Sequence, residues 1–147
     1  AYGGYHTEVA LLLRQAKAAG LELTVMGGDT MTNSELVTAA GDAADNVLFT
    51  FSPDARKNPD AAPIVEKFRA AKIEPEGYVL YAYAAMQLFE QAATAAKSTK
   101  YAALEKAMRD GSFKTVIGEL SFDAKGDQKA PGFVVYRWQG GKYDYVK

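Results

Sequence analysis

Residues 2–29, YGGYHTEVALLLRQAKAAGLELTVMGGD, decide the fold of this chain. The stretch opens on Tyr2-Gly-Gly-Tyr-His6 and closes on Gly27-Gly28-Asp29, with an amphipathic segment between them. We interpret both glycine pairs as lying at the ends of neighbouring strands. In an α/β sheet, small molecules bind beyond the carboxyl ends of the parallel strands. The sequence therefore predicts that Tyr5 and Asp29 lie together at the rim of a ligand pocket.

A helix is predicted between these two strand ends, over Thr7 to Ala19. Gly20 supplies a C-terminal stop, and the segment from Leu21 to Met26 is expected to be a short buried strand. The apolar residues of the helix recur at a helical period. They are Val9, Leu12, Leu13, Ala16 and Ala19.

The next elements are predicted from their caps. Thr32, with Glu35 three residues later, fits a capping box for a brief helix to about Ala40. Asn46 to Phe51 is expected to be a strand. Ser52 to Pro59 is then expected to be a loop or a crossing between subdomains, and its charged residues are expected to be solvated. The charged residues of this loop are Asp54, Arg56 and Lys57. Asp60, just after it, is expected to be solvated as well.

Three helices follow in the prediction. The first begins with Asn58-Pro59 as N-cap and first helical residue. The second, Tyr78 to Ala96, is apolar on almost all sides in its first three turns, as expected of a helix packed on more than one side. The third runs from Tyr101 to Arg109 and is closed by Gly111. The inner face of the first is expected to comprise Ile64, Val65, Phe68 and Ala71.

The last third of the chain is predicted to be a β meander. Val116 to Phe122, Gly132 to Trp138 and Lys142 to Val146 have strand-like patterns, and Gly140-Gly141 predicts a tight turn. The order is therefore βαβαβ, three helices and a meander, and the helical block interrupts one sheet. This is the α/β class.

Composition excludes several classes of protein. The 147 residues are 48% hydrophobic and 24% charged, and the formal charge of −1 offers no basic stripe for nucleic acid. No apolar run approaches the roughly 20 residues that span a bilayer. Zero cysteines exclude disulfides and thiol chemistry. Because the sequence begins with Ala1 inside a predicted strand, we expect that a segment preceded it.

Catalytic and cofactor motifs are missing from the sequence. His6 is the single histidine. Its position beside a strand end is typical of a surface or hydrogen-bonded residue, and a metal site would lack a second histidine. The glycine pairs match neither GxxxxGK[ST] nor GxGxxG. We therefore expect no catalytic residue, no metal and no cofactor.

Two interpretations stay open for the candidate ligand residues. Asp29 is either a turn residue or a carboxylate that binds a ligand ammonium group by a charge-assisted hydrogen bond. Tyr5 and Tyr78 are either core rings with a solvated hydroxyl or ligand contacts. Tyr78, Tyr81 and Tyr83 together favour a buried helix over an aromatic cage.

The chain resembles the solute-binding proteins of branched-chain amino-acid ABC transporters, the Leu/Ile/Val-binding proteins. The resemblance runs through the whole sequence in order. The matching strings are Tyr2-Gly-Gly-Tyr-His6, Leu13-Arg-Gln-Ala16 with Ala19-Gly-Leu21, Met26-Gly-Gly-Asp29, Ala40-Gly-Asp-Ala-Ala44, Pro75-Glu-Gly-Tyr78 with Tyr83-Ala-Ala85, Thr115-Val-Ile-Gly118 and Phe122-Asp-Ala-Lys-Gly-Asp127.

The resemblance implies the type I periplasmic-binding-protein fold, in which two Rossmann-like lobes close on an amino acid by a hinge. The chain looks like the C-terminal two-fifths of such a protein. Residues 1–51 and 132–147 would belong to the C-terminal lobe and residues 52–131 to the N-terminal lobe. The hinge would lie near Phe51 to Pro53 and near Pro131 to Phe133. The missing N-terminal segment, or a second copy, would complete both lobes.

The resemblance also assigns ligand contacts. Tyr5 matches the tyrosine at the backbone end of the ligand, Asp29 the acid that binds the α-ammonium, and Tyr78 an aromatic that covers the side-chain pocket. Many relatives have glutamate at the position of Asp29, and the first-lobe residues that bind the carboxylate have no counterpart here. The implied protein is a periplasmic, non-enzymatic partner of a membrane permease, exported by a signal peptide. The alternatives are a ligand-sensing regulatory domain of the same fold and, third, a flavodoxin-like or Rossmann enzyme.

Overall fold

A computed structural model describes residues 1–129 and 132–146 and divides the chain into two compact units. Unit 1 comprises Ala1–Pro53 with Gly132–Lys147, and unit 2 comprises Asp54–Pro131. The chain thus leaves unit 1 after β2 and returns to it before β5. Pro131, part of the expected second crossing, lies outside the described residues.

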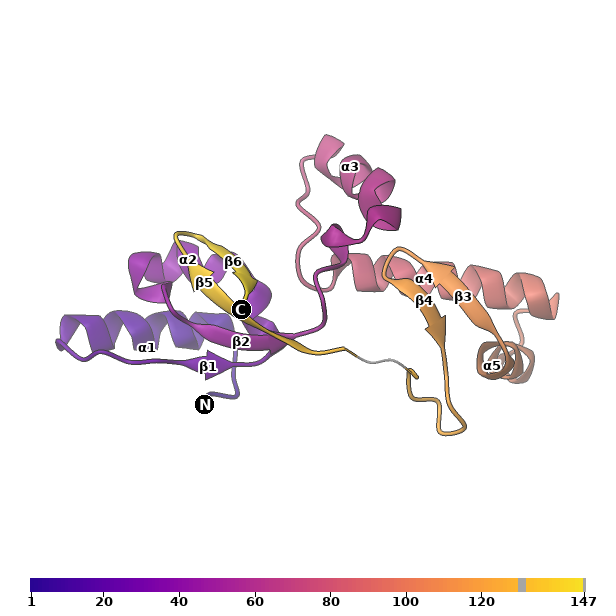
Figure 1. Ribbon diagram of the computed structural model, residues 1–147, viewed down its shortest axis with the longest axis horizontal. Helices are drawn as coiled ribbons and strands as arrows, with labels where there is room; N and C mark the ends of the chain where they lie inside the picture. Colours follow the sequence, from indigo (N-terminus) through magenta and orange to yellow (C-terminus); the bar gives the residue numbers. More distant parts are fainter. Residues whose placement is uncertain (130–131, 147) are drawn as a thin grey trace. The chain divides into compact units, whose positions relative to one another are not determined.

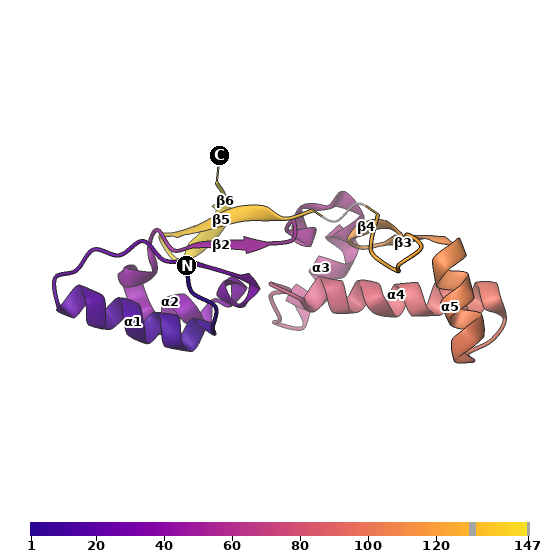
Figure 2. The ribbon, with the colours of Figure 1, turned by 90° about the horizontal axis from the view of Figure 1, so that it is seen from below.

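Unit 1 is a mixed four-stranded sheet with both of its α-helices on one face (Figure 1, Figure 2). The strand order is β1-β2-β5-β6, with β1 parallel to β2 and the other neighbours antiparallel. The elements are α1 (His6–Ala18), β1 (Met26–Gly27), η1 (Asp29–Thr32), α2 (Glu35–Ala40), η2 (Gly41–Ala44), β2 (Leu48–Phe51), β5 (Val134–Gln139) and β6 (Lys142–Tyr145).

An aromatic cluster forms the core of unit 1 on the helix-covered face of the sheet. Phe49 lies opposite Tyr136 in the register, and their rings stack with centroids 5.0 Å apart. The edge of the Tyr143 ring meets Phe49 at 5.3 Å and Trp138 at 4.8 Å. Such offset and edge-on pairs add to the hydrophobic gain of burial. The cluster joins β2 firmly to the returning β5–β6 hairpin.

The predicted first helix is confirmed, with one change to its inner face. Val9, Leu13 and Ala16 are buried as expected, whereas Leu12 and Ala19 are exposed. Gly20 ends the helix with φ of 71°, and the backbone N–H of Leu21 bonds the Ala16 carbonyl. This left-handed C-terminal residue is where glycine costs least.

The expected buried strand from Leu21 to Met26 is wrong in most of its length. The strand is only β1, Met26–Gly27, while Leu21 and Leu23 are 59% and 49% exposed. The Tyr2 segment is likewise not a strand, although its backbone N–H bonds the Met26 carbonyl at 2.8 Å. Apolar composition alone favoured a buried strand, but the described residues leave these side chains uncovered.

The predicted capping box of the second helix is also wrong. The Thr32 hydroxyl donates backwards to the Asp29 carbonyl at 2.8 Å and so closes η1. It is the side chain of Asn33 that accepts from the Glu35 backbone N–H at 2.9 Å. Threonine and asparagine can both make such local bonds, so the sequence did not distinguish the two arrangements.

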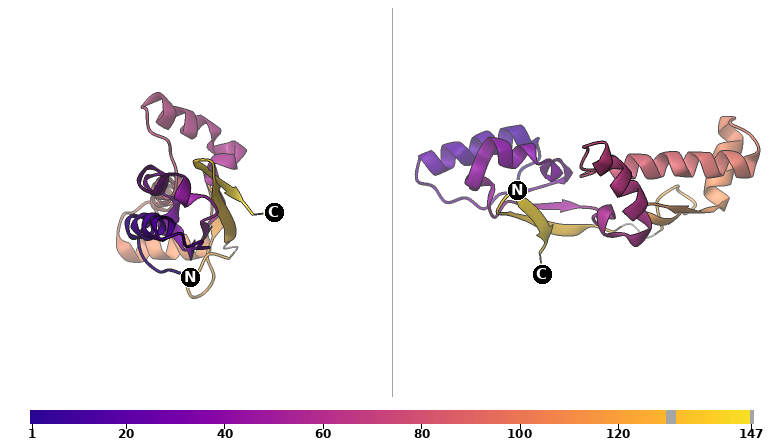
Figure 3. Two further views of the ribbon diagram at one scale, coloured as in Figure 1. Left: turned by 90° about the vertical axis from the view of Figure 1, so that its left-hand side faces the viewer. Right: turned by 90° about the horizontal axis from the view of Figure 1, so that it is seen from above.

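Unit 2 combines three α-helices and two short 3-10 helices with a two-stranded antiparallel hairpin. The hairpin packs along α4, and α5 crosses the C-terminal end of α4 (Figure 2, Figure 3). Two apolar clusters form its core, one around Val65, Leu80 and Ala84 and one around Ala92, Leu104 and Phe113. The elements are η3 (Ala55–Lys57), η4 (Pro59–Ala61), α3 (Ala62–Ala70), α4 (Val79–Ala96), α5 (Tyr101–Asp110), β3 (Ser112–Thr115) and β4 (Gly118–Ser121).

The hairpin corrects the predicted meander. The segment from Val116 to Phe122 is not one strand of a common sheet, because Val116 and Ile117 form a two-residue turn between β3 and β4. β3 was not predicted at all, since its sequence SFKT holds a single large apolar side chain. The β5–β6 hairpin and its Gly140-Gly141 turn, with φ of 56° and 78°, are as expected.

The helical part of unit 2 follows the prediction with differences in burial. Asn58 caps η4 by accepting from the Asp60 backbone N–H, and Pro59 is its first residue. Val65 is buried and Ile64 and Phe68 are half-buried, but Ala71 is exposed. On α4, Leu80 and Ala84 are buried while Met86 is 66% exposed. The apolar first turns of α4 are therefore only partly covered by the described residues.

Candidate functional site

The turn after β1 carries Asp29 and is held from several sides. The backbone N–H of Met31 bonds the Gly28 carbonyl, which makes the first turn of η1. The indole Nε1–H of Trp138 donates to the Met31 carbonyl at 2.8 Å, although 107 positions separate the two residues. Met31 is fully buried. Asp29, the first residue of η1, thus stands half-buried on a fixed backbone.

The Tyr5 segment lies beside this turn. The Thr30 hydroxyl donates to the Gly4 carbonyl at 2.7 Å. Tyr5 follows Gly4 directly and Asp29 precedes Thr30, so the two candidate residues stand on neighbouring backbones. Tyr5 is 64% exposed and is not a core ring. Its backbone N–H bonds the Glu8 carboxylate at 2.9 Å, which fixes the entry into α1.

The chemistry of this corner of unit 1 suits a cation with an adjacent polar group. Asp29 offers carboxylate oxygens, which are hydrogen-bond acceptors when ionised, and Tyr5 offers a phenolic hydroxyl. Glu8 and Glu35 add negative charge at the starts of α1 and α2. An ionised Asp29 carboxylate can accept a charge-assisted hydrogen bond from an ammonium group, which it cannot do from an anion.

His6 is a hydrogen-bonded residue, as the sequence predicts. Its Nε2 lies 3.1 Å from a carboxylate oxygen of Glu35, and its side chain is 15% exposed. The contact joins the first residue of α1 to the first residue of α2. His6 therefore ties the two helix starts together, close in sequence to Tyr5.

Tyr78 belongs to unit 2, where it is the N-cap residue of α4. Tyr78 is 57% exposed, so the interpretation of it as a core ring does not hold, and its role as a ligand contact stays a prediction. Its ring meets that of Tyr81 edge-on, with centroids 6.4 Å apart.

A charged network fixes the loop that leads to Tyr78. Arg56 donates to both carboxylate oxygens of Asp54 and, at 3.0 Å, to Glu74. With side chains 20% and 13% exposed, Arg56 and Asp54 are half-buried, so the expectation that they are freely solvated is wrong. The hydrogen bonds and charges of Arg69 and Arg56 hold the pKa of Glu74 below its ordinary value.

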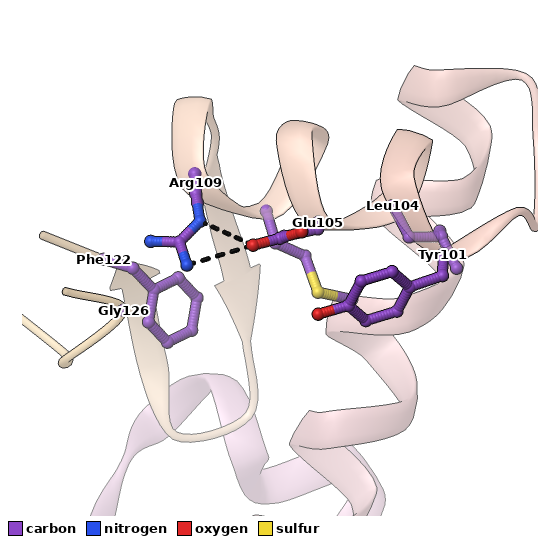
Figure 4. Close-up of a pocket in the computed structure, with 7 residues that line it drawn as sticks. Tyr101, Leu104, Glu105, Arg109, Phe122 and Gly126 are labelled. Atoms are coloured by element: carbon purple, nitrogen blue, oxygen red, sulfur yellow. Dashed lines mark hydrogen bonds and ion pairs between the residues drawn. The ribbon is translucent and has the colours of Figure 1, made fainter. Parts of the chain in front are cut away.

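A separate apolar pocket of about 370 Å³ lies on unit 2 (Figure 4). Tyr101, Leu104 and Met108 of α5 line it together with Phe122, and an Arg109–Glu105 ion pair of 3.1 Å closes one side. None of the three candidate ligand residues lines this pocket. Within residues 1–129 and 132–146, no group of three His, Asp or Glu side chains is arranged to hold a metal ion.

Comparison with known proteins assigns the family. The model of the periplasmic binding protein family matches residues 2–142. The chain belongs to the periplasmic binding protein family. Its relatives in this family include the Leu/Ile/Val-binding protein homolog 1 of Brucella suis, which is 48% identical over 150 residues. An amino acid binding protein of Pseudomonas aeruginosa is 40% identical over 145 residues.

Solved structures of the family have the same fold. A leucine-binding protein of Thermotoga maritima matches 99% of this chain with a TM-score of 0.84 and 26% identity. The isoleucine complex of a branched-chain amino-acid transporter substrate-binding protein from Streptococcus pneumoniae gives a TM-score of 0.80 at 26% identity. The expected type I periplasmic-binding-protein fold is thereby confirmed for this portion of it.

The chain is shorter than these relatives. It covers 40% of the Brucella suis protein, 39% of the Pseudomonas aeruginosa protein and 42% of the Thermotoga maritima chain. Its family is a binding-protein family, which agrees with the absence of catalytic motifs from the sequence. No helix in the described part is both long and apolar enough to cross a bilayer.

The sequence did not reveal the residues that hold the candidate site in place. The bond from Thr30 to Gly4 spans 26 positions, and the bond from Trp138 to Met31 spans 107. Neither pairing produces a periodic or regularly spaced pattern in the sequence. The single tryptophan, in a strand otherwise rich in valine, was the one available indication of a special packing role.

Proposed function

We propose that the full-length protein containing this chain binds leucine, isoleucine or valine between two lobes and delivers it to the membrane permease of an ABC transporter. The family, and relatives whose names specify Leu/Ile/Val binding, support this. One observation connects this proposal to particular residues. The Thr30–Gly4 hydrogen bond sets the backbones next to Asp29 and Tyr5 side by side.

The chemistry of an amino acid explains the roles proposed for the three residues. A zwitterion loses its hydration on entering a cleft, so each charged end needs a compensating partner there. We assign the α-ammonium to the Asp29 carboxylate, the backbone end of the ligand to the Tyr5 hydroxyl, and cover of the aliphatic side chain to Tyr78. The donors for the ligand carboxylate would come from a part of the protein outside this chain.

The two units suit a hinge mechanism. We assign unit 1 to the C-terminal lobe and unit 2 to the N-terminal lobe, with crossings next to Pro53 and next to Gly132. Closure of the lobes would sequester the ligand and present a closed form to the permease. Delivery to a permease implies export to the periplasm. A rotation axis that passes elsewhere, for instance through Lys97 to Lys100, would contradict this assignment of the hinge.

Calorimetric titration of the full-length protein with leucine, isoleucine and valine tests the proposal. Asp29→Asn should weaken binding by about 1.5 to 3 kcal/mol, the scale of a hydrogen bond to a charged group. Tyr5→Phe should cost less, about 0.5 to 1.5 kcal/mol, because its hydroxyl makes a neutral bond. Equal affinity of the Asp29→Asn variant would refute the ammonium site.

A ligand-sensing regulatory domain of the same fold is the alternative proposal. It would bind the same ligands and control an attached output module instead of a permease. The Streptococcus pneumoniae structure that matches 98% of this chain is a transporter substrate-binding protein, which favours transport. Reconstitution with the permease in vesicles distinguishes the two, since only a transport protein stimulates leucine uptake.

A further inference from the structure

We propose that Thr30 is a positioning residue for amino-acid binding, one that holds the Tyr5 segment against the Asp29 turn. This inference rests on the proposed function. The hydroxyl of Thr30 donates to the Gly4 carbonyl at 2.7 Å and is half-buried. Successive Cα atoms lie about 3.8 Å apart, so the bond fixes the backbone one residue away from each candidate ligand residue.

The Tyr5 segment needs such a bond because of its own sequence. Gly3 and Gly4 precede Tyr5, and open space surrounds the position where a side chain of Gly3 would stand. Glycine has the largest conformational freedom of any residue. A backbone bond from Tyr2 to Met26 fixes the start of the segment. At its end, the Glu8 carboxylate bonds the Tyr5 N–H within the same segment, whereas the Thr30 hydroxyl, on the Gly4 carbonyl, ties it to the Asp29 turn.

Thr30 is itself held by a rigid turn. Trp138 donates to the carbonyl of the fully buried Met31, and Thr32 donates to the carbonyl of Asp29, both at 2.8 Å. Thr30 stands between these two anchored carbonyls, so its hydroxyl is a donor in a fixed place. Rigid support of contact residues lowers the entropy lost when a ligand binds.

The test is leucine binding by the full-length protein, measured by calorimetry, with Thr30→Val as the main variant. Valine keeps the branched shape and removes the hydroxyl, so Kd should rise about three- to ten-fold, the range of one neutral hydrogen bond. Thr30→Ser keeps the hydroxyl and should restore binding. Thr38→Val is the matched control, because the Thr38 hydroxyl bonds the Ser34 carbonyl at 3.4 Å, on α2; its Kd should not change.

A double variant separates positioning from general stability. If Thr30 acts through Asp29, Thr30→Val should raise Kd less in an Asp29→Asn background than in the native protein. Thr30→Ala, which also lacks the hydroxyl, provides a second variant should valine strain the turn. Affinities are compared at a temperature where thermal melts show every variant folded.

The outcomes are distinct. Unchanged leucine affinity in both Thr30→Val and Thr30→Ala would overturn the positioning role and leave the proposed function intact. The same holds if the Kd of the double variant rises by the full product of the two single-variant factors. Unchanged affinity in Asp29→Asn would overturn the ammonium site and this inference with it. A rise in Kd for Thr30→Val that Thr30→Ser reverses supports the inference.

Discussion

Trp138 shows how one side chain links the core of unit 1 to its candidate site. Its indole ring packs edge-on against Tyr143 in the aromatic cluster, while its N–H bonds the Met31 carbonyl in the turn that carries Asp29. The residue is 2% exposed. A buried carbonyl without its donor costs about 1 to 3 kcal/mol, so this one bond matters to the fold as well as to the site.

Trp138→Phe should therefore destabilise the full-length protein by about 2 to 4 kcal/mol, from the unpaired Met31 carbonyl together with the lost ring volume. Urea denaturation followed by circular dichroism measures the change. Tyr101→Phe is the control, because Tyr101 is 79% exposed and surface changes usually stay within about 0.5 kcal/mol. A loss for Trp138→Phe no larger than that of the control would contradict the role given to the indole bond.

At the residue scale, the sequence could predict which segments form the site but not what holds them. The glycine pairs before Tyr5 and Asp29 are local signals that mark breaks in regular structure, although only Gly27-Gly28 stands at a strand end. Thr30 acts on Gly4, 26 positions away. Such a partner depends on how the strands pair, which no local pattern encodes. The exposure of Tyr78, for which the sequence left a core ring and a ligand contact both open, depends equally on neighbours far along the chain.

Among the elements, unit 2 depends on joints between its helices and its hairpin. The side chain of Asn58 accepts from the Asp60 backbone N–H and donates from Nδ2 to the Val116 carbonyl at 2.8 Å. One residue thus caps η4 and anchors the turn of the β3–β4 hairpin. Removing it breaks a cap and leaves a half-buried carbonyl without this donor.

Asn58→Ala should lower the free energy of unfolding by about 1 to 3 kcal/mol, combining the loss of a cap with the loss of a hydrogen bond. Asn58→Asp should recover part of this, because a carboxylate still accepts from the Asp60 N–H but offers no donor to Val116. Chemical denaturation of the three proteins provides the comparison. Equal stability of Asn58→Asp and the native protein would show that the bond to Val116 contributes nothing.

Glu74 predicts an acid-dependent part of the stability. Hydrogen bonds and charges from Arg69 and Arg56 lower its folded pKa below the ordinary 4.5, so its contribution is complete above that pH and is lost as the pH falls through the folded value. Its side chain is 41% exposed, which limits the contribution to about 0.5 to 1 kcal/mol after solvent screening. Glu74→Gln should melt below the native protein near neutral pH and converge with it in acid.

Melting curves recorded from about pH 7 down to about pH 3 test this linkage. Glu66→Gln, an exposed carboxylate on α3, serves as the control and should follow the native protein throughout. A difference between Glu74→Gln and the native protein that is independent of pH would mean that packing, rather than charge, is what the substitution alters.

At the element scale, the apolar pattern predicted α1 and α3 through helical spacing and α4 through a run that is apolar on almost all sides. It failed for the β3–β4 hairpin, whose turn is Val116-Ile117 in place of the usual glycine or asparagine. It failed again for Leu21 to Met26, where an apolar run forms only the two residues of β1. Both errors arise where apolar side chains stand outside a regular strand.

At the scale of the whole molecule, apolar surface remains uncovered on both units. In unit 1, Leu21 and Leu23 are 59% and 49% exposed beside the short edge strand β1. In unit 2, Met86 and Phe89 of α4 are 66% and 40% exposed. Exposed strand edges attract further strands, and exposed apolar side chains gain by burial. This surface is where we expect the remainder of the full-length protein, or a second copy, to pack.

Expressed alone, the 147-residue chain should therefore pair with a separately supplied N-terminal segment, associate with a second copy or stay poorly ordered, and it should bind no amino acid. Its Asp29 and Tyr5 would lack the donors that the ligand carboxylate needs, so leucine would gain too little to offset its lost hydration. Light scattering gives the mass, and thermal melting with and without millimolar leucine reports binding, because a ligand that binds the folded state raises its melting point. Adding the N-terminal segment should restore both a defined mass and the leucine-dependent rise. A stable monomer of the isolated chain whose melting point rises with leucine would refute the prediction, since it would mean that the residues of this chain already bind both ends of the ligand.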